Sequence, residues 1–184
     1  MTTHIAETSR LILRHFDAVD AEFIFALVND PDWIRFIGDR NVFTLDDARA
    51  YIATRLVAAY ARQGFGFWLV EIKEVRRSIG MCGLNLRDGL DDVDIGFAFL
   101  PQYRGQGYAL EAAHGTLVYA RDVLRLQRIV AITAVDNDRS TWLLEKLGLR
   151  FESLIRLPND NEHVKLFGST LSPGGQNAHP AGMG

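Results

Sequence analysis

The chain has 184 residues, of which 48% are hydrophobic and 23% charged, and this is the composition of one globular domain large enough to bury a full core. Its 20 basic and 23 acidic residues give a net charge of −3, which argues against a nucleic-acid partner bound through a basic face. No run approaches the roughly 18 apolar residues that a membrane span needs, and residues 1–14 do not read as a signal peptide. Cys82 is the single cysteine, which leaves no intramolecular disulfide and points to a reducing compartment. We therefore expect a cytoplasmic protein with no membrane partner.

Hydrophobic periodicity changes several times along the chain, from a period of two residues, typical of strands, to the period of a helix. The resulting order, β-α-α-β-β-β-α-β-α-β-β, predicts a single-domain α/β fold around one mixed, mostly antiparallel sheet with helices on both faces. The expected elements are a strand over 10–16, a helix from Asp17 to about Val28, a helix from Thr44 to just before Gly64, strands over 65–72, 77–86 and 93–100, a helix from about Tyr108, a strand over 128–135, a helix from Asp136 or Asn137 to Gly148, and strands over 150–157 and 163–168.

Specific residues mark several ends of these elements. Thr44 with Asp47 three places later is close to a capping box. The first helix is expected to end at residues 29–31, where Asn, Asp and Pro follow one another. The strand over 128–135 is apolar on both faces, as a strand in the middle of a sheet should be.

A loop with two glycines connects a predicted strand to a predicted helix at the centre of the chain. Gly105 and Gly107 stand where the helix begins. The first turn of a helix has amides without partners, and the helix dipole adds partial positive charge, so such a loop can close around an anionic phosphate. A dinucleotide fingerprint would need a third glycine where Leu110 stands, and a P-loop would need Gly-Lys-Ser/Thr. The remaining pattern is Gln102-x-x-Gly105-x-Gly107.

With this pattern, Q/R-x-x-G-x-G/A, the chain resembles the GNAT superfamily of acyl-CoA N-acyltransferases, and more closely the RimJ/RimL-like branch that includes ribosomal-protein N-terminal acetyltransferases. Four segments match in order: ETSRLILR at the start, Ile79-Gly80, DIGFAFLPQYRGQGYALEA, and VDNDRSTWLLEKLGLRFE. The resemblance covers residues 7–170, which we take as the domain. Residues 172–184 are small and polar and are expected to form a mobile tail.

The resemblance implies that acetyl-CoA is the co-substrate. It would lie in a cleft between the strand that ends at Leu100 and the strand that begins at Arg128, which splay apart. Backbone groups of the first strand would hold the pantetheine as an added strand does, and one N–H would stabilise the oxyanion. The loop amides would take the pyrophosphate, and Arg104 is expected near a phosphate. The implied cofactor-binding residues are Phe97, Ala98, Phe99, Leu100, Arg104, Gly105, Gln106, Gly107, Tyr108, Ala109, Asn137 and Ser140.

Asp94 is the candidate general base. A protonated amine must lose a proton before it attacks a thioester, and a carboxylate on the strand beside the thioester could accept it. Many relatives have glutamate at this position, so the shorter aspartate favours transfer through a water molecule. The alternative is that Asp94 is a solvated turn residue in an acidic hairpin.

The general acid is where the chain departs from the wider family. Leu144 occupies a position where many relatives have tyrosine. Either Ser140 protonates the departing thiolate, or no strong acid is needed, because a thiol with a pKa of about 8.5 leaves readily near neutral pH. Ser140 could instead bond its hydroxyl to the helix backbone. The histidines and Cys82 have no metal-ligand spacing, so we expect no metal.

These observations predict an N-acetyltransferase that transfers acetyl from acetyl-CoA directly to a primary amine. The resemblance favours a protein N-terminus as acceptor, while the same branch also acts on small amines and antibiotics. The alternative from another class is a non-catalytic acyl-CoA-binding module. We expect a monomer or a homodimer. An aromatic-rich segment could border the acceptor site, as it does in relatives, or only pack the helices on the sheet; its residues are Trp33, Phe36, Ile37 and Phe43.

Overall fold

A mixed sheet forms the centre of the structure, a computed structural model that describes residues 3–158 and 160–172. In this part of the chain the sheet has eight strands in the order β1-β2-β3-β4-β5-β6-β8-β7. All neighbours are antiparallel except β5 and β6. The strands are β1 (His4–Glu7), β2 (Leu11–Arg14), β3 (Phe67–Ile72), β4 (Arg77–Asn85), β5 (Asp94–Phe99), β6 (Arg128–Ala134), β7 (Arg150–Arg156) and β8 (His163–Thr170).

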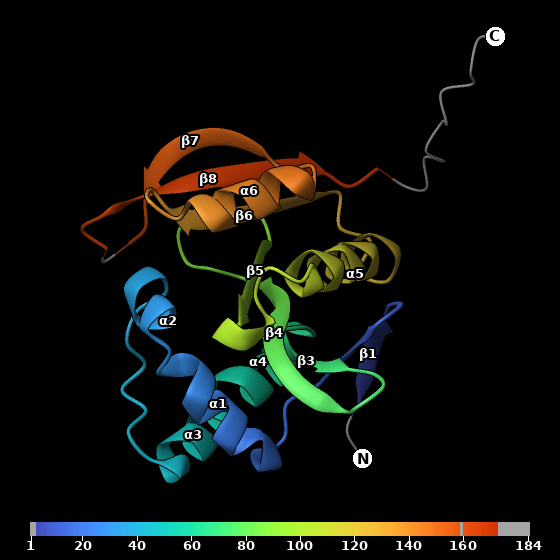
Figure 1. The fold of residues 1–184 in the computed structure, drawn as a ribbon. Helices are drawn as coiled ribbons and strands as arrows, with labels where there is room; N and C mark the ends of the chain where they lie inside the picture. Colours follow the sequence, from blue (N-terminus) through green and yellow to red (C-terminus); the bar gives the residue numbers. More distant parts are fainter. Residues whose placement is uncertain (1–2, 159, 173–184) are drawn as a thin grey trace, which may run out of the picture.

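Helices cover both faces of this sheet, as predicted. In Figure 1, α1, α3 and α4 gather in the lower part, while α6 lies with β6, β7 and β8 in the upper part. The helices are α1 (Ala21–Val28), α2 (Pro31–Phe36), α3 (Leu45–Tyr51), α4 (Ala58–Gln63), α5 (Tyr108–Asp122) and α6 (Asp138–Lys146). None of the helices within the described ranges is long and apolar enough to cross a membrane.

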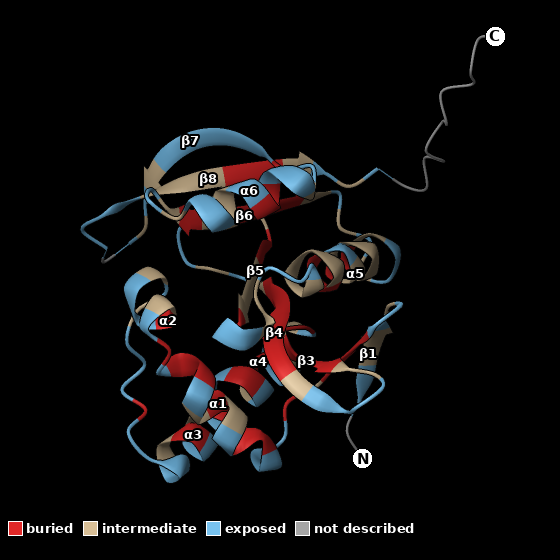
Figure 2. Ribbon diagram, viewed as in Figure 1, coloured by how far each residue is buried: buried red, intermediate tan, exposed pale blue. Residues whose placement is uncertain are grey.

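Two hydrophobic clusters pack the helices against the two faces of the sheet. One packs α5 and α6 against the sheet through residues such as Trp68, Ile95 and Ala113, and the other packs α1 and α3 through residues such as Ile24 and Leu69. Figure 2 shows β4 largely buried and β7, at the sheet edge, largely exposed. A fully buried leucine or isoleucine side chain contributes about 1.5–3 kcal/mol, so the two clusters fix the helices on their faces.

The predicted caps are confirmed. Asp17 caps the 3-10 turn that precedes α1, and Thr44 with Asp47 forms a full capping box at α3. Gly64 ends α4 with φ +80, and Gly148 follows α6 with φ +89. Both glycines adopt the left-handed conformation that disfavours other residues.

Three local predictions were incomplete. The expected strand over 10–16 corresponds to β2 (Leu11–Arg14), and a further strand that was not predicted, β1 (His4–Glu7), precedes it; residues 8–10 form the turn between them and bond to Glu111 on α5. Pro31 also begins a helix, α2, which Asp30 caps. In the first turn of a helix the backbone N–H has no partner within the helix, so proline, which has no N–H, fits there. The helix from Thr44 to Gly64 contains a π-helical segment, Ile52–Val57, between α3 and α4.

The strands β5 and β6 separate almost as soon as they meet. Among the described residues, Asp94 and Val130 are their only paired positions, and the Val130 amide donates to Val93 O at 3.0 Å. On its other edge β6 pairs with β8 along its whole length, from Arg128 to Ala134. The predicted splay between the two strands is therefore present, with Asp94 at its apex.

Candidate functional site

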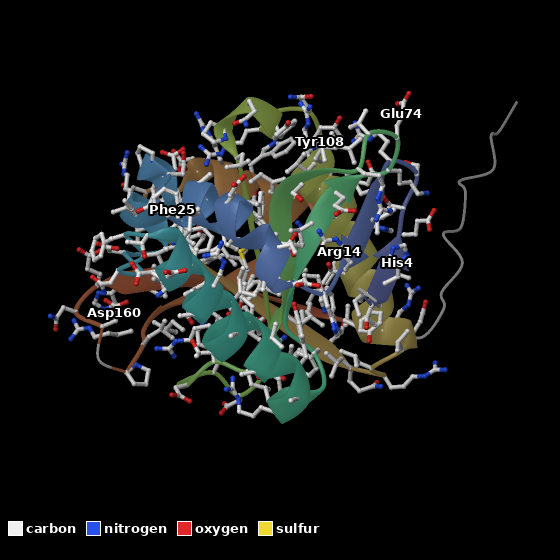
Figure 3. All side chains as sticks on the ribbon, turned by 90° about the horizontal axis from the view of Figure 1, so that it is seen from below. His4, Arg14, Phe25, Glu74, Tyr108 and Asp160 are labelled. Atoms are coloured by element: carbon white, nitrogen blue, oxygen red, sulfur yellow. The ribbon has the colours of Figure 1, made fainter. Side chains whose placement is uncertain are left out.

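A cleft opens where β5 and β6 part. Its volume is about 1130 Å³, slightly above the usual range for a ligand site. It is lined by β5, by the end of β6, by the loop before α5, by the start of α6 and by residues of α2. Figure 3 labels Tyr108 and Asp160, which both line the cleft and lie well apart in that view.

The backbone of β5 offers free hydrogen-bonding groups to this cleft. The Leu100 amide donates to Ile79 O on β4 at 3.0 Å. Because backbone groups alternate sides along an antiparallel strand, Ala98 also faces β4, while Phe97 and Phe99 face the side that β6 has left. Of the four predicted β5 positions, Phe97 and Phe99 can therefore extend hydrogen bonds to an added chain.

The loop before α5 presents a run of free amides. Among the described residues, no backbone amide in 105–110 donates to a protein acceptor. Gly105 and Gly107 have φ +72 and +80, so the loop takes a left-handed path twice. A side chain at Gly107 would place its Cβ 3.3 Å from Arg10 Nη2. The loop is thus a cradle of the kind that binds phosphate groups at a helix N-terminus.

Arg10, not predicted for this site, is the cation next to the cradle. Its Nη1 donates to Gln106 O at 3.1 Å, its Nε donates to Glu111 at 2.6 Å, and its guanidinium lies 4.4 Å from the Tyr108 ring centroid. Glu111 also accepts from Thr8 and Ser9. Burial alone would raise the pKa of Glu111, but these hydrogen bonds outweigh it and lower the pKa. An ionised Glu111 therefore fixes Arg10 beside the loop.

Arg104, predicted near a phosphate, is turned toward α2. Its guanidinium donates to Asp30 at 2.5 Å, to Asp32 at 2.6 Å and to Phe99 O at 2.8 Å. The backbone amide of Arg104 also donates, to Pro101 O at 3.2 Å. Arg104 thus ties the loop to α2 with its charge already matched, and its contact with a phosphate stays a prediction.

Most of the other predicted loop and strand positions line the cleft. Of the described residues predicted to bind the cofactor, Leu100 and Gln106 alone lie outside the cleft lining. The Gln106 side chain donates back to Gln102 O at 2.8 Å, although its amide is free. Gly105, Gly107, Tyr108 and Ala109 all line the cleft.

Asp94 is deeply buried, with 1% of its surface exposed, and it lines the cleft. It is therefore not a solvated turn residue. Its Oδ2 accepts from Arg87 Nε at 2.6 Å. Burial raises the pKa of Asp94, and Arg87 opposes this shift without cancelling it. A buried carboxylate with a raised pKa in a cleft is a candidate for proton transfer.

Asn137 and Ser140 lie together at the start of α6, as their spacing predicted. The Asn137 side chain caps the helix by accepting from the Ser140 amide at 3.1 Å. Both residues line the cleft, and within the described residues the Ser140 hydroxyl makes no hydrogen bond. Leu144 lines the same region and is 1% exposed, so it supplies packing and no proton.

The aromatic segment contributes to the α2 side of the cleft. Trp33, Phe36 and Ile37 line it, whereas Phe43 is 69% exposed and lies outside the lining. The cleft lining also contains residues that the sequence did not single out, namely Arg40, Tyr51, Phe67, Met81 and Arg87. Burial raises the pKa of Tyr51, which keeps its hydroxyl protonated.

Of these overlooked residues, Arg87 had a detectable signal. The predicted hairpin between the strands over 77–86 and 93–100 brings its two ends together, and Asn85 pairs with Asp94. A cation two residues after Asn85 is therefore placed to meet the carboxylate. Arg10 had no such signal, because its contact with α5 joins residues 101 apart in sequence.

Comparison with known proteins gives consistent matches over most of the chain. The acetyltransferase (GNAT) domain family matches residues 10–150. The uncharacterized N-acetyltransferase YoaA of Bacillus subtilis is 31% identical over 153 residues, which are 83% of this chain and 86% of the relative.

Solved structures share the fold. A GNAT-family acetyltransferase from Bacillus anthracis superposes with a TM-score of 0.76 at 26% identity and covers 93% of this chain and 99% of its own. RimL, a ribosomal L7/L12 alpha-N-protein acetyltransferase, superposes with a TM-score of 0.77 at 16% identity over 92% and 95% of the two chains. At that identity the second likeness concerns the fold.

Proposed function

Because the chain belongs to the GNAT acetyltransferase family, we propose that it transfers an acetyl group from acetyl-CoA to a primary amine by direct attack in a ternary complex. The observation that carries the proposal is the placing of three features around one cleft. These are the free amides of residues 105–110, the unpaired backbone edge at Phe97 and Phe99, and the buried carboxylate of Asp94.

Acetyl-CoA fits the shape and polarity of this cleft. The amides at Gly105 to Leu110, together with Arg10, would hold the pyrophosphate. The N–H and C=O groups of Phe97 and the N–H of Phe99 would pair with the amide groups of the pantetheine arm, while Phe99 O already accepts from Arg104, and Asn137 would reach the arm from α6. Bound acetyl-CoA supplies an activated thioester.

The residues at the apex of the cleft can promote attack on that thioester. The amide of Phe97 or Phe99 would donate to the carbonyl oxygen as negative charge develops on it. Asp94 would accept the proton from the amine, directly or through a water molecule. Ser140, with its free hydroxyl, would pass a proton to the departing sulfur and regain one from water; the sulfur can also leave as a thiolate, because a thiol pKa of about 8.5 makes it a good leaving group near neutral pH. Holding both reactants in place supplies much of the rate advantage.

A covalent route through an acyl-cysteine does not suit this chain. Cys82 is its only cysteine, it is 0% exposed, and burial raises the pKa of its thiol to about 12. A buried thiol of this kind is neither ionised nor reachable. Direct transfer predicts that double-reciprocal plots of initial rate against acetyl-CoA concentration, each at a fixed acceptor concentration, give intersecting lines. Parallel lines would contradict it.

The acceptor that we propose is a protein N-terminus, and a small-molecule amine is the second candidate. The resemblance to the ribosomal-protein acetyltransferases supports the first candidate, and the apolar wall of Trp33, Phe36 and Ile37 suits either candidate. Leu144, in place of a tyrosine acid, is the observation that favours a non-catalytic acyl-CoA-binding module. Acetyl-CoA binding without turnover for any amine would identify that module.

A further inference from the structure

The apex of the cleft holds a charge pair that the proposed chemistry uses only in part. Arg87 stands in the hairpin loop between β4 and β5, and its Nε donates to Asp94 Oδ2 at 2.6 Å. Both residues line the cleft. The side chain of Asp94 is 2% exposed, while that of Arg87 is 33% exposed, so the arginine forms the solvent side of the pair.

The loop holds Arg87 in place independently of this pair. The Leu90 amide donates to Arg87 O at 3.1 Å and closes a turn. Gly89, at φ +87, packs against the ring of Pro158 from the loop between β7 and β8, where a side chain would not fit. A side chain on a turn fixed from both sides is preorganised, which lowers the cost of binding with it.

Each member of the pair keeps unused atoms. Arginine carries five N–H donors in a planar fork, and Asp94 takes only the one on Nε. Within the described residues, neither Nη group of Arg87 donates to a protein acceptor, and Asp94 Oδ1 accepts no hydrogen bond. The pair therefore offers a carboxylate oxygen and guanidinium donors side by side.

Resting on the proposed function, we propose that Arg87 is a specificity-determining residue, which binds an oxygen atom adjacent to the reacting amine of the acceptor. An α-amino carbonyl unit has its amine nitrogen and its carbonyl oxygen separated by only two carbon atoms. When the amine lies at Asp94, that oxygen falls next to the Nη donors of Arg87. The acceptors selected in this way are peptide N-termini, amino-acid amides and amino acids, whereas a simple alkyl amine has no oxygen to offer.

The chemistry of arginine favours this role over simple neutralisation of Asp94. Lysine would also balance the charge of Asp94, but its compact ammonium would be taken up by the carboxylate and would leave no separate edge to bind the acceptor. The planar fork lets one edge hold Asp94 while the other binds a neutral or anionic oxygen. Hydrogen bonds to a charged donor discriminate strongly, because an acceptor without the oxygen leaves the donors unmatched.

The test compares wild type and Arg87→Lys with two acceptors, phenylalaninamide and 2-phenylethylamine, which differ by the carboxamide group that carries the oxygen. Acetyl-CoA-dependent thiol release gives kcat/KM for each. Comparing variant with wild type for each acceptor cancels the difference in amine basicity. The variant is expected to lower kcat/KM for phenylalaninamide by about tenfold or more beyond any change that it causes for 2-phenylethylamine, which is the value of one hydrogen bond to a charged group.

Arg121→Lys is the matched control, because Arg121 is also 33% exposed and pairs with Asp122 at 2.7 Å away from the cleft lining. It should change neither acceptor, and the acetyl-CoA Kd should be the same in all three proteins. An equal fall for both acceptors in Arg87→Lys would overturn the inference, since Arg87 would then only position Asp94. Wild-type release with 2-phenylethylamine and none with phenylalaninamide would overturn it too and leave the proposed function intact. No release with any primary amine would overturn both.

Discussion

Gly107 is the position where the phosphate cradle can be tested by one substitution. Gly107 has φ +80 and ψ 0 and is the N-cap of α5. Alanine there must hold a left-handed conformation, which costs about 1–2 kcal/mol, and its Cβ would lie 3.3 Å from Arg10 Nη2. If the loop relaxes to relieve this strain, its amides move. Loss of one amide–phosphate hydrogen bond, about 1.5–3 kcal/mol, raises the Kd by about 10- to 150-fold.

The assay is calorimetric titration of acetyl-CoA into Gly107→Ala, with Gly148→Ala as a matched control. Gly148 has φ +89 with nothing within 4 Å of a built Cβ, and it lies outside the cleft lining. Both variants should lose similar thermal stability because they carry the same backbone strain. Only Gly107→Ala should lose affinity. Wild-type affinity in Gly107→Ala, or an equal loss in both variants, would refute the cradle.

Three further substitutions test the catalytic and structural assignments. Asp94→Asn should lower kcat/KM by about 10²–10⁴-fold, the usual contribution of a positioned base, and should remove an acid limb that lies above the ordinary aspartate pKa of 3.8; a pH–rate profile shared with wild type would exclude the base. Ser140→Ala should lower kcat most below about pH 8.5, where a departing thiolate takes up a proton; a loss independent of pH would contradict proton donation. Glu111→Gln should lower the free energy of unfolding by about 1.5–3 kcal/mol, because Glu111 accepts four hydrogen bonds. Folding lowers the pKa of Glu111 below its ordinary value of 4.5. The difference in unfolding free energy between wild type and Glu111→Gln should therefore persist above pH 4.5 and disappear as the pH falls through the folded pKa. Urea titrations that show the same difference in acid would contradict the assignment.

Elements with local signals could be predicted from the sequence. The antiparallel strands β3, β4 and β5 follow from alternation and short turns, and the capping box at Thr44 and Asp47 marks α3 within one residue. The α2 helix was missed because Pro31 reads as a stop. Its place in the first turn depends on the Asp30 cap, whose carboxylate Arg104 also binds.

The candidate site shows the same division. The glycines of the loop, together with Asn137 and Ser140, could be named from motif spacing, and the structure brings them to one cleft. The direction in which the arginine side chains point could not be predicted from the sequence. Arg104 points to α2, and Arg10 arrives at the loop from the far end of the chain. Both placements depend on contacts between residues more than 70 positions apart, which no local pattern encodes. The predicted tail lies outside the described residues from residue 173 on.

The central claim is acetyl transfer from acetyl-CoA to an amine at Asp94. The most direct measurement follows CoA thiol release and acceptor mass together, over a panel of N-terminal peptides, amino-acid amides, polyamines and aminoglycosides. The account predicts equimolar thiol release and acetylated amine with at least one acceptor class, peptides before the others, and loss of both signals in Asp94→Asn. Acetyl-CoA binding without acceptor-dependent release across the whole panel would contradict it.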